Sequence, residues 1–184
     1  YGDGWYVNEQ PSHRVTLESF AIDTTEVTAA KYAQFVQYGC GADCLDERMP
    51  MGVRDGVVFL DAAHVDVPIT YVSRRDAALY CQWLGKRLPS EAEYERAAIG
   101  ADDRNWPWTI EGGPTCLHTN FSYEGGRCDN APYAVGSRAD HVTAEGVFDL
   151  AGNVSEWVDD DFTIYPDGVT VVQDAGSFGG IRGG

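Results

Sequence analysis

Basic residues and long apolar runs are scarce in this 184-residue sequence. Thirteen Lys and Arg residues stand against 29 Asp and Glu residues, which gives a formal net charge of −16 at pH 7. Nucleic acids and anionic membranes bind positively charged proteins, so this charge argues against both as partners. No apolar run approaches the ~20 residues that a membrane-spanning helix needs, so direct membrane insertion is not expected. The surplus carboxylates serve solubility or hold a hard cation such as calcium.

Several catalytic and metal-binding signatures are also missing. The five cysteines contain no C-x2-C pair, and the four histidines are not spaced to complete a tetrahedral zinc site. No G-x-S-x-G nucleophile motif occurs, and the glycine-rich end GSFGGIRGG has no Walker lysine. These absences argue against a zinc finger, a serine hydrolase of the nucleophile-elbow type and a P-loop nucleotidase.

The cysteine spacing indicates disulfides. Cys40 and Cys44 lie in a short polar loop and could close a small ring, while Cys116 and Cys128 flank a glycine-rich loop and could close another. Spacing alone cannot decide whether either pair forms. Cys81 lies on the apolar face of a predicted helix and is interpreted as a buried, unreactive thiol. Two loop disulfides would suit an extracytoplasmic compartment, whether periplasmic, secreted or surface-anchored.

Composition and local patterns predict one loop-rich α+β domain. Twenty-one Gly and 8 Pro indicate many turns and few long regular elements. Alternating apolar residues predict a half-buried strand over 15–22, and a capped helix is expected over 28–38. Asp55-Gly56 predicts a hairpin turn, residues 100–146 read mainly as loop, and a short strand is expected over 169–172.

Residues 73–100 predict two capped helices joined by a tight connector. Ser73 with Asp76 and Ser90 with Glu93 have the spacing of a capping box, in which the hydroxyl accepts from a free backbone N–H and the acid reaches back. Glycines stand where each helix is expected to end, at Gly85 and Gly100. Such a pair occurs in many folds, so by itself it identifies no family.

Four segments carry more specific wording, and they occur in a fixed order along the chain. They are HRVTLESFAIDTTEVTAAKYAQFV, WLGKRLPSEAEYERAA, WPW followed by Asn120-Phe121, and GVFDLAGNVSEW. Together they resemble the formylglycine-generating enzyme family, also called sulfatase-modifying factors. This resemblance implies an elaborated C-type-lectin-like fold with little regular secondary structure.

The last of these segments is a candidate calcium site. Asp149 and Glu156 supply two carboxylates, and Gly152-Asn153 allows a turn between them, as in loops that wrap calcium. The resemblance implies that the ligands are Asp149, Gly152, Val154 and Glu156, the middle two through their carbonyls. An ordinary turn with two solvated acids is the alternative.

The resemblance implies two further sites. A second structural calcium would involve Asn120 and Phe121, with Asp129 as the best candidate for its acid. Glu26 matches a position near the substrate groove of the family, although it could also be a polar residue at a junction between a strand and a helix. Both calcium ions would order loops that have no core of their own.

For the activity, the resemblance implies oxidases that convert a cysteine in a Cys-x-Pro-x-Arg motif of a sulfatase to formylglycine. Two cysteines shortly after an Arg-Gly-Gly-Ser-like segment would bind copper(I), which soft thiolates suit. None of the five cysteines lies at the matching position, since the sequence ends at Gly184 where that segment begins. We therefore expect residues 1–184 to be a single domain cut at both ends, without catalytic residues. Copper is expected only if a longer parent supplies those cysteines.

Two other functions fit the same residues. A non-catalytic, calcium-stabilised module could bind a protein or glycan ligand on the lectin-like scaffold, because fold and function separate readily. A mononuclear iron sulfoxide synthase would require an attached helical domain with histidine ligands. The expected partners are a sulfatase polypeptide, another protein or a glycan. Since the chain starts at Tyr1, any signal peptide or anchor before it would be lost.

Overall fold

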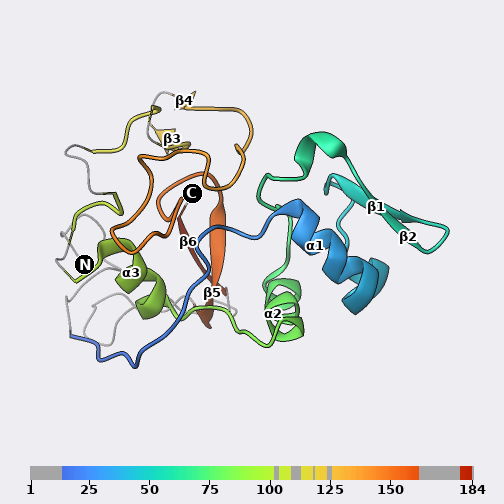
Figure 1. Ribbon diagram of the computed structural model, residues 1–184, viewed down its shortest axis with the longest axis horizontal. Helices are drawn as coiled ribbons and strands as arrows, with labels where there is room; N and C mark the ends of the chain where they lie inside the picture. The colour runs from blue at the N-terminus through green and yellow to red at the C-terminus, as the bar shows by residue number, and fades with distance from the viewer. Residues whose placement is uncertain are drawn as a thin grey trace, which may run out of the picture.

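The computed structural model describes residues 14–101, 104–108, 113–117, 119–123, 126–161 and 179–183. Two groups of elements lie side by side, and the segment before the first helix runs from one to the other (Figure 1). We call residues 28–84 the aromatic half. The loop half consists of residues 85–183 together with 14–27.

The aromatic half begins with α1, Ala29–Phe35, which continues into a π-helical turn at Val36–Cys40 and a 3-10 turn at Gly41–Cys44. Thr28 caps α1, since its hydroxyl accepts from the Lys31 N–H at 3.2 Å. The helical turns predicted over 28–38 are therefore confirmed, although only the first part of them is regular α-helix.

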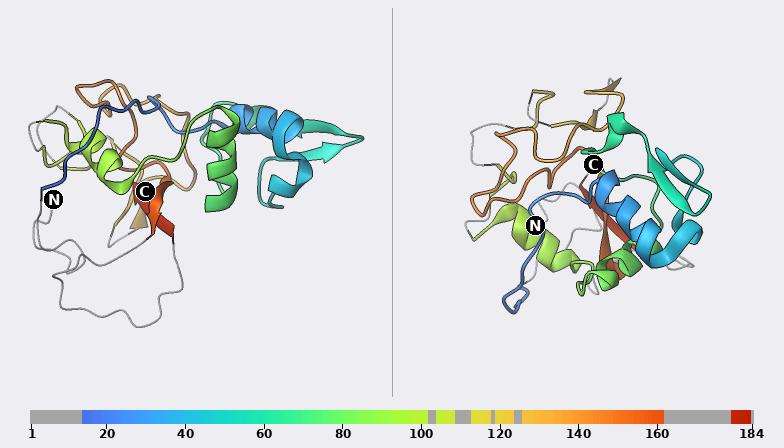
Figure 2. Two further views of the ribbon diagram at one scale, coloured as in Figure 1. Left: turned by 90° about the horizontal axis from the view of Figure 1, so that it is seen from below. Right: turned by 45° about the vertical axis from the view of Figure 1, so that its right-hand side comes forward.

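A hairpin extends from α1 at the far end of the aromatic half (Figure 2). Strands β1, Met51–Arg54, and β2, Val57–Leu60, pair antiparallel. The turn residues have φ of 52° at Asp55 and 76° at Gly56, the double positive φ of a type I′ turn. The predicted hairpin is confirmed because this dipeptide tolerates the left-handed conformation.

The second helix, α2, spans Arg74–Trp83 and closes the apolar core of the aromatic half. Its N-cap is Ser73, as predicted, and the Ser73 hydroxyl accepts from the Asp76 N–H. The Asp76 carboxylate accepts from the Ser73 hydroxyl, whereas in a full capping box it would accept from the Ser73 backbone N–H. Phe35 packs edge-to-face against Tyr80, with ring centroids 5.6 Å apart. The rest of this buried cluster comprises Ala29, Tyr32, Val36, Cys44, Met49 and Met51.

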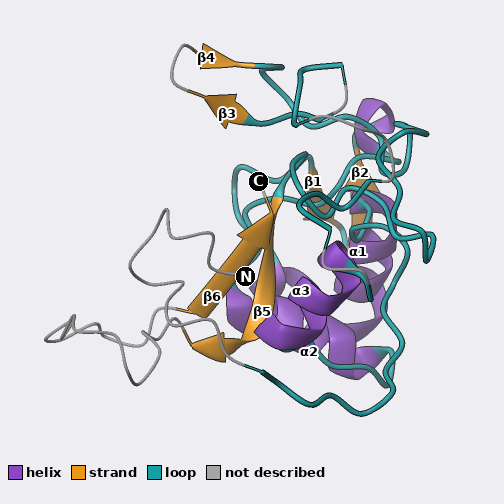
Figure 3. Cartoon of the chain, turned by 90° about the vertical axis from the view of Figure 1, so that its left-hand side faces the viewer, coloured by secondary structure: helices purple, strands orange, loops and turns teal. Residues whose placement is uncertain are grey.

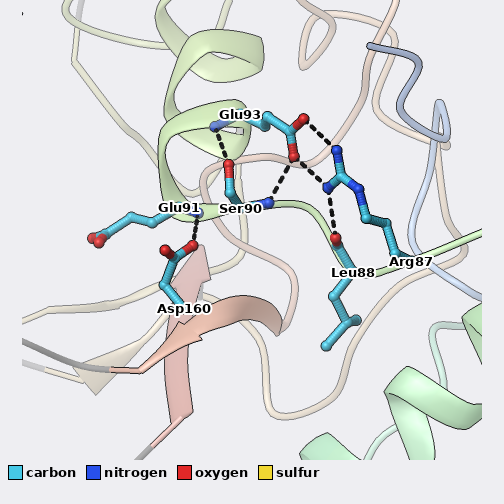
Figure 4. Close-up of polar contacts among 6 residues, drawn as sticks. All are labelled: Arg87, Leu88, Ser90, Glu91, Glu93 and Asp160. Atoms are coloured by element: carbon cyan, nitrogen blue, oxygen red, sulfur yellow. Dashed lines mark hydrogen bonds and ion pairs between the residues drawn. The ribbon is translucent and has the colours of Figure 1, made fainter. Parts of the chain in front are cut away.

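A short connector leads to α3, Glu91–Ile99, in the loop half (Figure 4). Ser90 and Glu93 form the complete predicted capping box, with the Ser90 N–H donating to the Glu93 carboxylate at 2.8 Å. Arg87 donates to the same carboxylate from both terminal nitrogens at 2.6 Å and also donates to the Leu88 carbonyl. The connector is thus fixed by one buried acid.

Strands β5, Ser155–Asp161, and β6, Gly179–Gly183, pair antiparallel and lie beside α2 and α3 (Figure 3). Two shorter strands, β3 (Ser122–Tyr123) and β4 (Gly126–Arg127), form a separate hairpin. The apolar cluster of this half is smaller than the first and contains Tyr94, Ala97, Ala98, Val147, Leu150 and Val158.

Both predicted disulfides are present. Cys40 and Cys44 are bonded with Cα atoms 6.0 Å apart, and Cys116 and Cys128 with Cα atoms 5.0 Å apart. Cys81 is free and half-buried, and burial raises the pKa of its thiol, as expected of an unreactive cysteine. None of the helices in the described part of the chain is both long and apolar enough to cross a membrane.

The strand predicted over 15–22 is wrong. All of this segment is described, none of it pairs as a strand, and Val15 is 51% exposed. Alternation indicates only which side chains could share a face, whereas a strand also needs a neighbour for its backbone hydrogen bonds. Here Ile22 instead packs against the apolar cluster of the loop half. The strand predicted over 169–172 lies outside the described residues.

Candidate functional site

A groove of about 910 Å3 lies between the two halves. The aromatic half lines it with Tyr71, Tyr80 and Cys81, and the loop half with Glu26, Asn153 and Glu156. Residues from segment 19–27, from the connector at 86–89 and from positions 120–121 and 129–132 add to the wall.

The turn at Gly152 lies next to Asn153 and Val154, which line the groove. Its φ of 128° is strained for any other residue, and a Cβ there would lie 1.8 Å from the Thr119 Oγ1 and 2.9 Å from the Asn120 carbonyl oxygen. The two segments are held together because the Asn153 N–H donates to the Asn120 carbonyl at 2.8 Å. The Thr119 hydroxyl adds a bond of 2.6 Å to the Ala151 carbonyl. The two predicted calcium segments are therefore docked on one another.

Asn153 joins this turn to the segment that leads into the aromatic half. Its Nδ2 donates to Glu26 Oε1 at 2.8 Å, across 127 residues of sequence, and its Oδ1 accepts from the Tyr133 N–H at 3.1 Å. The residue has φ of 63°, which Asn tolerates better than most side chains. Sequence reasoning assigned Asn153 only to a turn, and the Gly-Asn pair carried no signal for its contact with Glu26.

Glu26 and Asp149 are buried acids that form no ion pair with a base among the described residues. Asp149 is 2% exposed, and its Oδ2 accepts from the Gly136 N–H at 2.8 Å. No N–H or hydroxyl group of the described residues donates to Asp149 Oδ1 or to Glu26 Oε2. Burial, followed by the negative charges of Asp149 and Glu156, raises the pKa of Glu26 to about 8. Two such carboxylates need either a proton or a cation.

Glu156 lies at the start of β5 with its carboxyl against Tyr94. The Tyr94 hydroxyl is 3.0 Å from Glu156 Oε1 and 3.1 Å from the Leu150 carbonyl oxygen. Burial, opposed by the hydrogen bond from Tyr94 and reinforced by the charge of Asp149, raises the pKa of Glu156 to about 7. Tyr94 is another residue that the sequence did not single out for the site.

This donor set fits a hard cation. Asp149 presents a buried oxygen that accepts no hydrogen bond from the described residues, and Glu156 lies near enough to repel it. Within the described ranges, no three acidic, histidine or cysteine side chains form a metal-binding group. A cation held by Asp149 and Glu156 would therefore need backbone carbonyls as further ligands, as calcium accepts.

The residues of the second predicted calcium site also lie close together, but their oxygens are engaged. Asn120 Oδ1 accepts from the Asp129 N–H at 3.0 Å, and the Phe121 carbonyl accepts from the Cys128 N–H at 3.1 Å. The Asp129 carboxylate lies 3.7 Å from an Arg138 nitrogen. In this arrangement the Asn120 side chain holds the loop at Asp129 by a hydrogen bond.

The groove carries an acidic wall. Among the described residues that line it, the two bases are each paired with an acid at 2.6 Å, Lys86 with Asp23 and Arg87 with Glu93. The other charged residues of the described lining are acidic: Glu26, Asp129 and Glu156. A ligand with a cationic group would complement this wall.

The cysteines do not fit a copper site. Four of the five are in disulfides, which leaves Cys81 as the one free thiol of residues 1–184. A two-thiolate copper(I) site needs a second free cysteine. No step of a copper oxidase can therefore be assigned to these side chains.

Comparison with known protein families matches the sulfatase-modifying factor enzyme 1-like domain over residues 1–184. The chain belongs to this family. The formylglycine-generating enzyme of Streptomyces coelicolor is 31% identical over 222 residues, covering 93% of this chain and 68% of that protein. The hercynine oxygenase of Mycolicibacterium smegmatis is 26% identical, covering 86% of this chain and 41% of the relative.

Among solved structures, PvdO from Pseudomonas aeruginosa aligns with a TM-score of 0.67 and 27% identity, covering 98% of this chain and 74% of that chain. The predicted α+β, C-type-lectin-like fold of the sulfatase-modifying-factor domain is thereby confirmed. Relatives within the family carry the names of different activities, so membership alone assigns none of them to this chain.

Proposed function

We propose that residues 1–184 form a calcium-stabilised binding module whose groove holds an extended polypeptide segment with a cationic side chain. The observation that carries the proposal is the acidic groove, in which Lys86 and Arg87 are already paired with acids while Glu26 forms no ion pair with a base among the described residues. A relative named formylglycine-generating enzyme supports a polypeptide ligand, since the expected target motif of that activity, Cys-x-Pro-x-Arg, contains an arginine.

Calcium is proposed at the Gly152 turn. The carboxylates of Asp149 and Glu156 and the carbonyls of Gly152 and Val154 would hold it, and the ion would supply positive charge where buried acids now face each other. It would also hold Asn153 in the position from which its amide donates to Glu26. We keep the second ion, at Asn120, Phe121 and Asp129, as an expectation of the family resemblance alone.

An oxidase is the second candidate, because a formylglycine-generating enzyme is aligned with 93% of this chain. These residues would supply its scaffold and groove, and further thiolates would have to come from outside residues 1–184, because Cys81 is the one free thiol within them. The two disulfides and the absence of a membrane-spanning helix among the described residues are compatible with an extracytoplasmic location.

Binding of a short labelled Cys-x-Pro-x-Arg peptide, followed by fluorescence anisotropy with calcium present, tests the proposal. The matched control peptide replaces Arg by Gln, and a Cys-to-Ser peptide controls for exchange of the peptide thiol with the Cys40–Cys44 or Cys116–Cys128 disulfide. We expect the Gln peptide to bind about tenfold more weakly, since it has no charge to match the acidic wall. The Ser peptide should bind as the parent does.

Equal binding of the Arg and Gln peptides, or none of either, would contradict the proposed ligand. Mass spectrometry of the same peptide after incubation with copper(I) and oxygen tests whether residues 1–184 have oxidase activity by themselves. An aldehyde in place of the peptide thiol would establish the oxidase for this chain. An unchanged thiol alongside tight binding is the result expected of the module, and it also fits an oxidase that takes its thiolates from outside these residues.

A further inference from the structure

Tyr71 has an unusual backbone conformation at the rim of the groove. Its φ of 63° is in the left-handed region, which a bulky aromatic residue seldom adopts. The residue lines the groove and is 52% exposed, so burial of its own ring does not compensate for the strain. Strain of this kind persists where surrounding structure imposes it, and it is concentrated at ligand-binding sites.

The chain is fixed on both sides of Tyr71. Before it, the Ile69 N–H donates to the Val27 carbonyl at 2.8 Å. After it, the Val72 carbonyl accepts from the Trp157 Nε1 at 2.9 Å, and Ser73 caps the next helix. These anchors leave Thr70 and Tyr71 between them, and of the two it is Tyr71 that has the positive φ.

The ring of Tyr71 is also held in place. The guanidinium carbon of Arg48 lies 4.3 Å from the ring centroid and covers one face. Asp46 holds that guanidinium with two bonds of 2.7 Å, to Nε and Nη2. The ring therefore keeps its other face and its edge open, and the Arg48–Asp46 pair behind it carries no net charge.

We propose that Tyr71 is a specificity-determining residue of the groove, and that its open face stacks on an uncharged ring side chain of the bound polypeptide, proline or an aromatic residue. The inference rests on the proposed peptide-binding function. A ring whose other face is covered by a pair without net charge favours a flat apolar partner over a charged one. The acidic wall then binds the cationic side chain of the polypeptide, and Tyr71 binds its ring side chain.

Three substitutions separate ring from strain. Tyr71→Phe keeps both, Tyr71→Leu keeps the strain and removes the ring, and Tyr71→Asn removes both. We expect Tyr71→Phe to bind the Cys-x-Pro-x-Arg peptide as wild type does, and the other two to bind about three- to tenfold more weakly. Tyr71→Asn should also melt about 2–4 °C above Tyr71→Leu, because Asn tolerates this φ.

A peptide with Ala in place of Pro is the control on the ligand side. It should bind wild type and Tyr71→Leu equally, because the ring contact is gone from both complexes. If Tyr71→Leu binds the Pro peptide as tightly as Tyr71→Phe does, the contact at Tyr71 is wrong while the groove function stands.

A second probe distinguishes failure of the ring contact from failure of the groove function. N-acetylprolinamide is titrated into wild type and Tyr71→Leu, with NMR detection of the tyrosine ring signals. If wild type binds no peptide but the Tyr71 signals shift on titration, the ring site stands and the proposed groove ligand falls. If neither the peptide nor the amide has an effect, the inference is overturned.

Discussion

The aromatic half and the loop half of this domain are stabilised by different physics. In the first, Phe35 and Tyr80 pack ring against ring in a cluster of large apolar side chains. In the second, the apolar cluster is small and the most buried turn contains Asp149 and Asn153. Apolar burial needs no exact partner atoms, whereas buried polar groups must each be matched.

The comparison explains where the groove lies. Apolar side chains pack closely against their neighbours and leave little empty space between them, as the buried Tyr80 does. Polar groups in hydrogen-bonded turns keep their oxygens in fixed positions, and Glu26, although buried, faces the boundary of the two halves. Carboxylates in fixed positions are thus expected on the loop-half side of the groove, and an aromatic contact on the side of the aromatic half.

Removal of a central ring should be the most damaging change to the aromatic half. Phe35→Ala leaves a cavity beside Tyr80 and Tyr32, and we expect it to lower the free energy of unfolding by about 3–5 kcal/mol. Tyr38→Ala is the matched control, because Tyr38 is 77% exposed and should change stability by less than about 0.5 kcal/mol. Urea unfolding measures both. A similar loss for the two variants would mean that this core is not held by ring packing.

The turn in the loop half should be almost as intolerant for a different reason. Gly152→Ala combines a positive φ with a collision against Thr119, and we expect a loss of about 2–4 kcal/mol. Gly146→Ala is the control, since Gly146 has φ of 87° but no atom within 4 Å of the added Cβ. The difference between the two variants measures the collision alone. Equal losses would show that the docking of the two segments is not tight.

Removal of calcium should affect the halves unequally. We expect chelation by EDTA to lower the melting temperature, and added calcium to restore a stabilisation of about 2–3 kcal/mol when the ion is well above its dissociation constant. Hydrogen exchange should rise around Asp149 and Asn153 and stay unchanged in α1. Glu156→Gln should abolish most of the calcium effect, whereas Glu18→Gln, an exposed change, should retain it. An identical melt with and without EDTA would contradict the structural ion.

The smallest expected effect concerns the connector that joins the halves. Hydrogen bonds from Arg87 lower the pKa of Glu93 from 4.5 to about 2, so the folded state favours the ionised acid. This contribution is complete above pH 4.5 and is lost as the pH falls through about 2. Glu93→Gln should therefore cost about 1 kcal/mol at neutral pH, and its difference from wild type should shrink in acid. A difference that is constant between pH 6 and pH 2 would contradict the assignment of the Arg87–Glu93 pair; urea unfolding at each pH measures it.

Local features were predicted well because their causes lie within a few residues. The Ser90–Glu93 cap, the Asp55-Gly56 turn and both disulfide rings depend on short loops and on which side chains can reach a neighbouring N–H. The strand expected over 15–22 failed because its partner would have to come from elsewhere in the fold. The two calcium segments were found by resemblance, and their direct contact through Thr119 was not foreseen.

The sequence by itself determined the family, the helix caps, the hairpin and the acidic character of this protein, since each follows from local backbone chemistry or from residue identity. Only the tertiary structure decided which carboxylates are buried near one another and that Asn153 donates to Glu26. It also decided that Tyr71 adopts a left-handed conformation with Arg48 over its ring. Those outcomes depend on distances between segments far apart in the chain, and burial at such meeting points sets both the strain and the charge that a ligand would encounter.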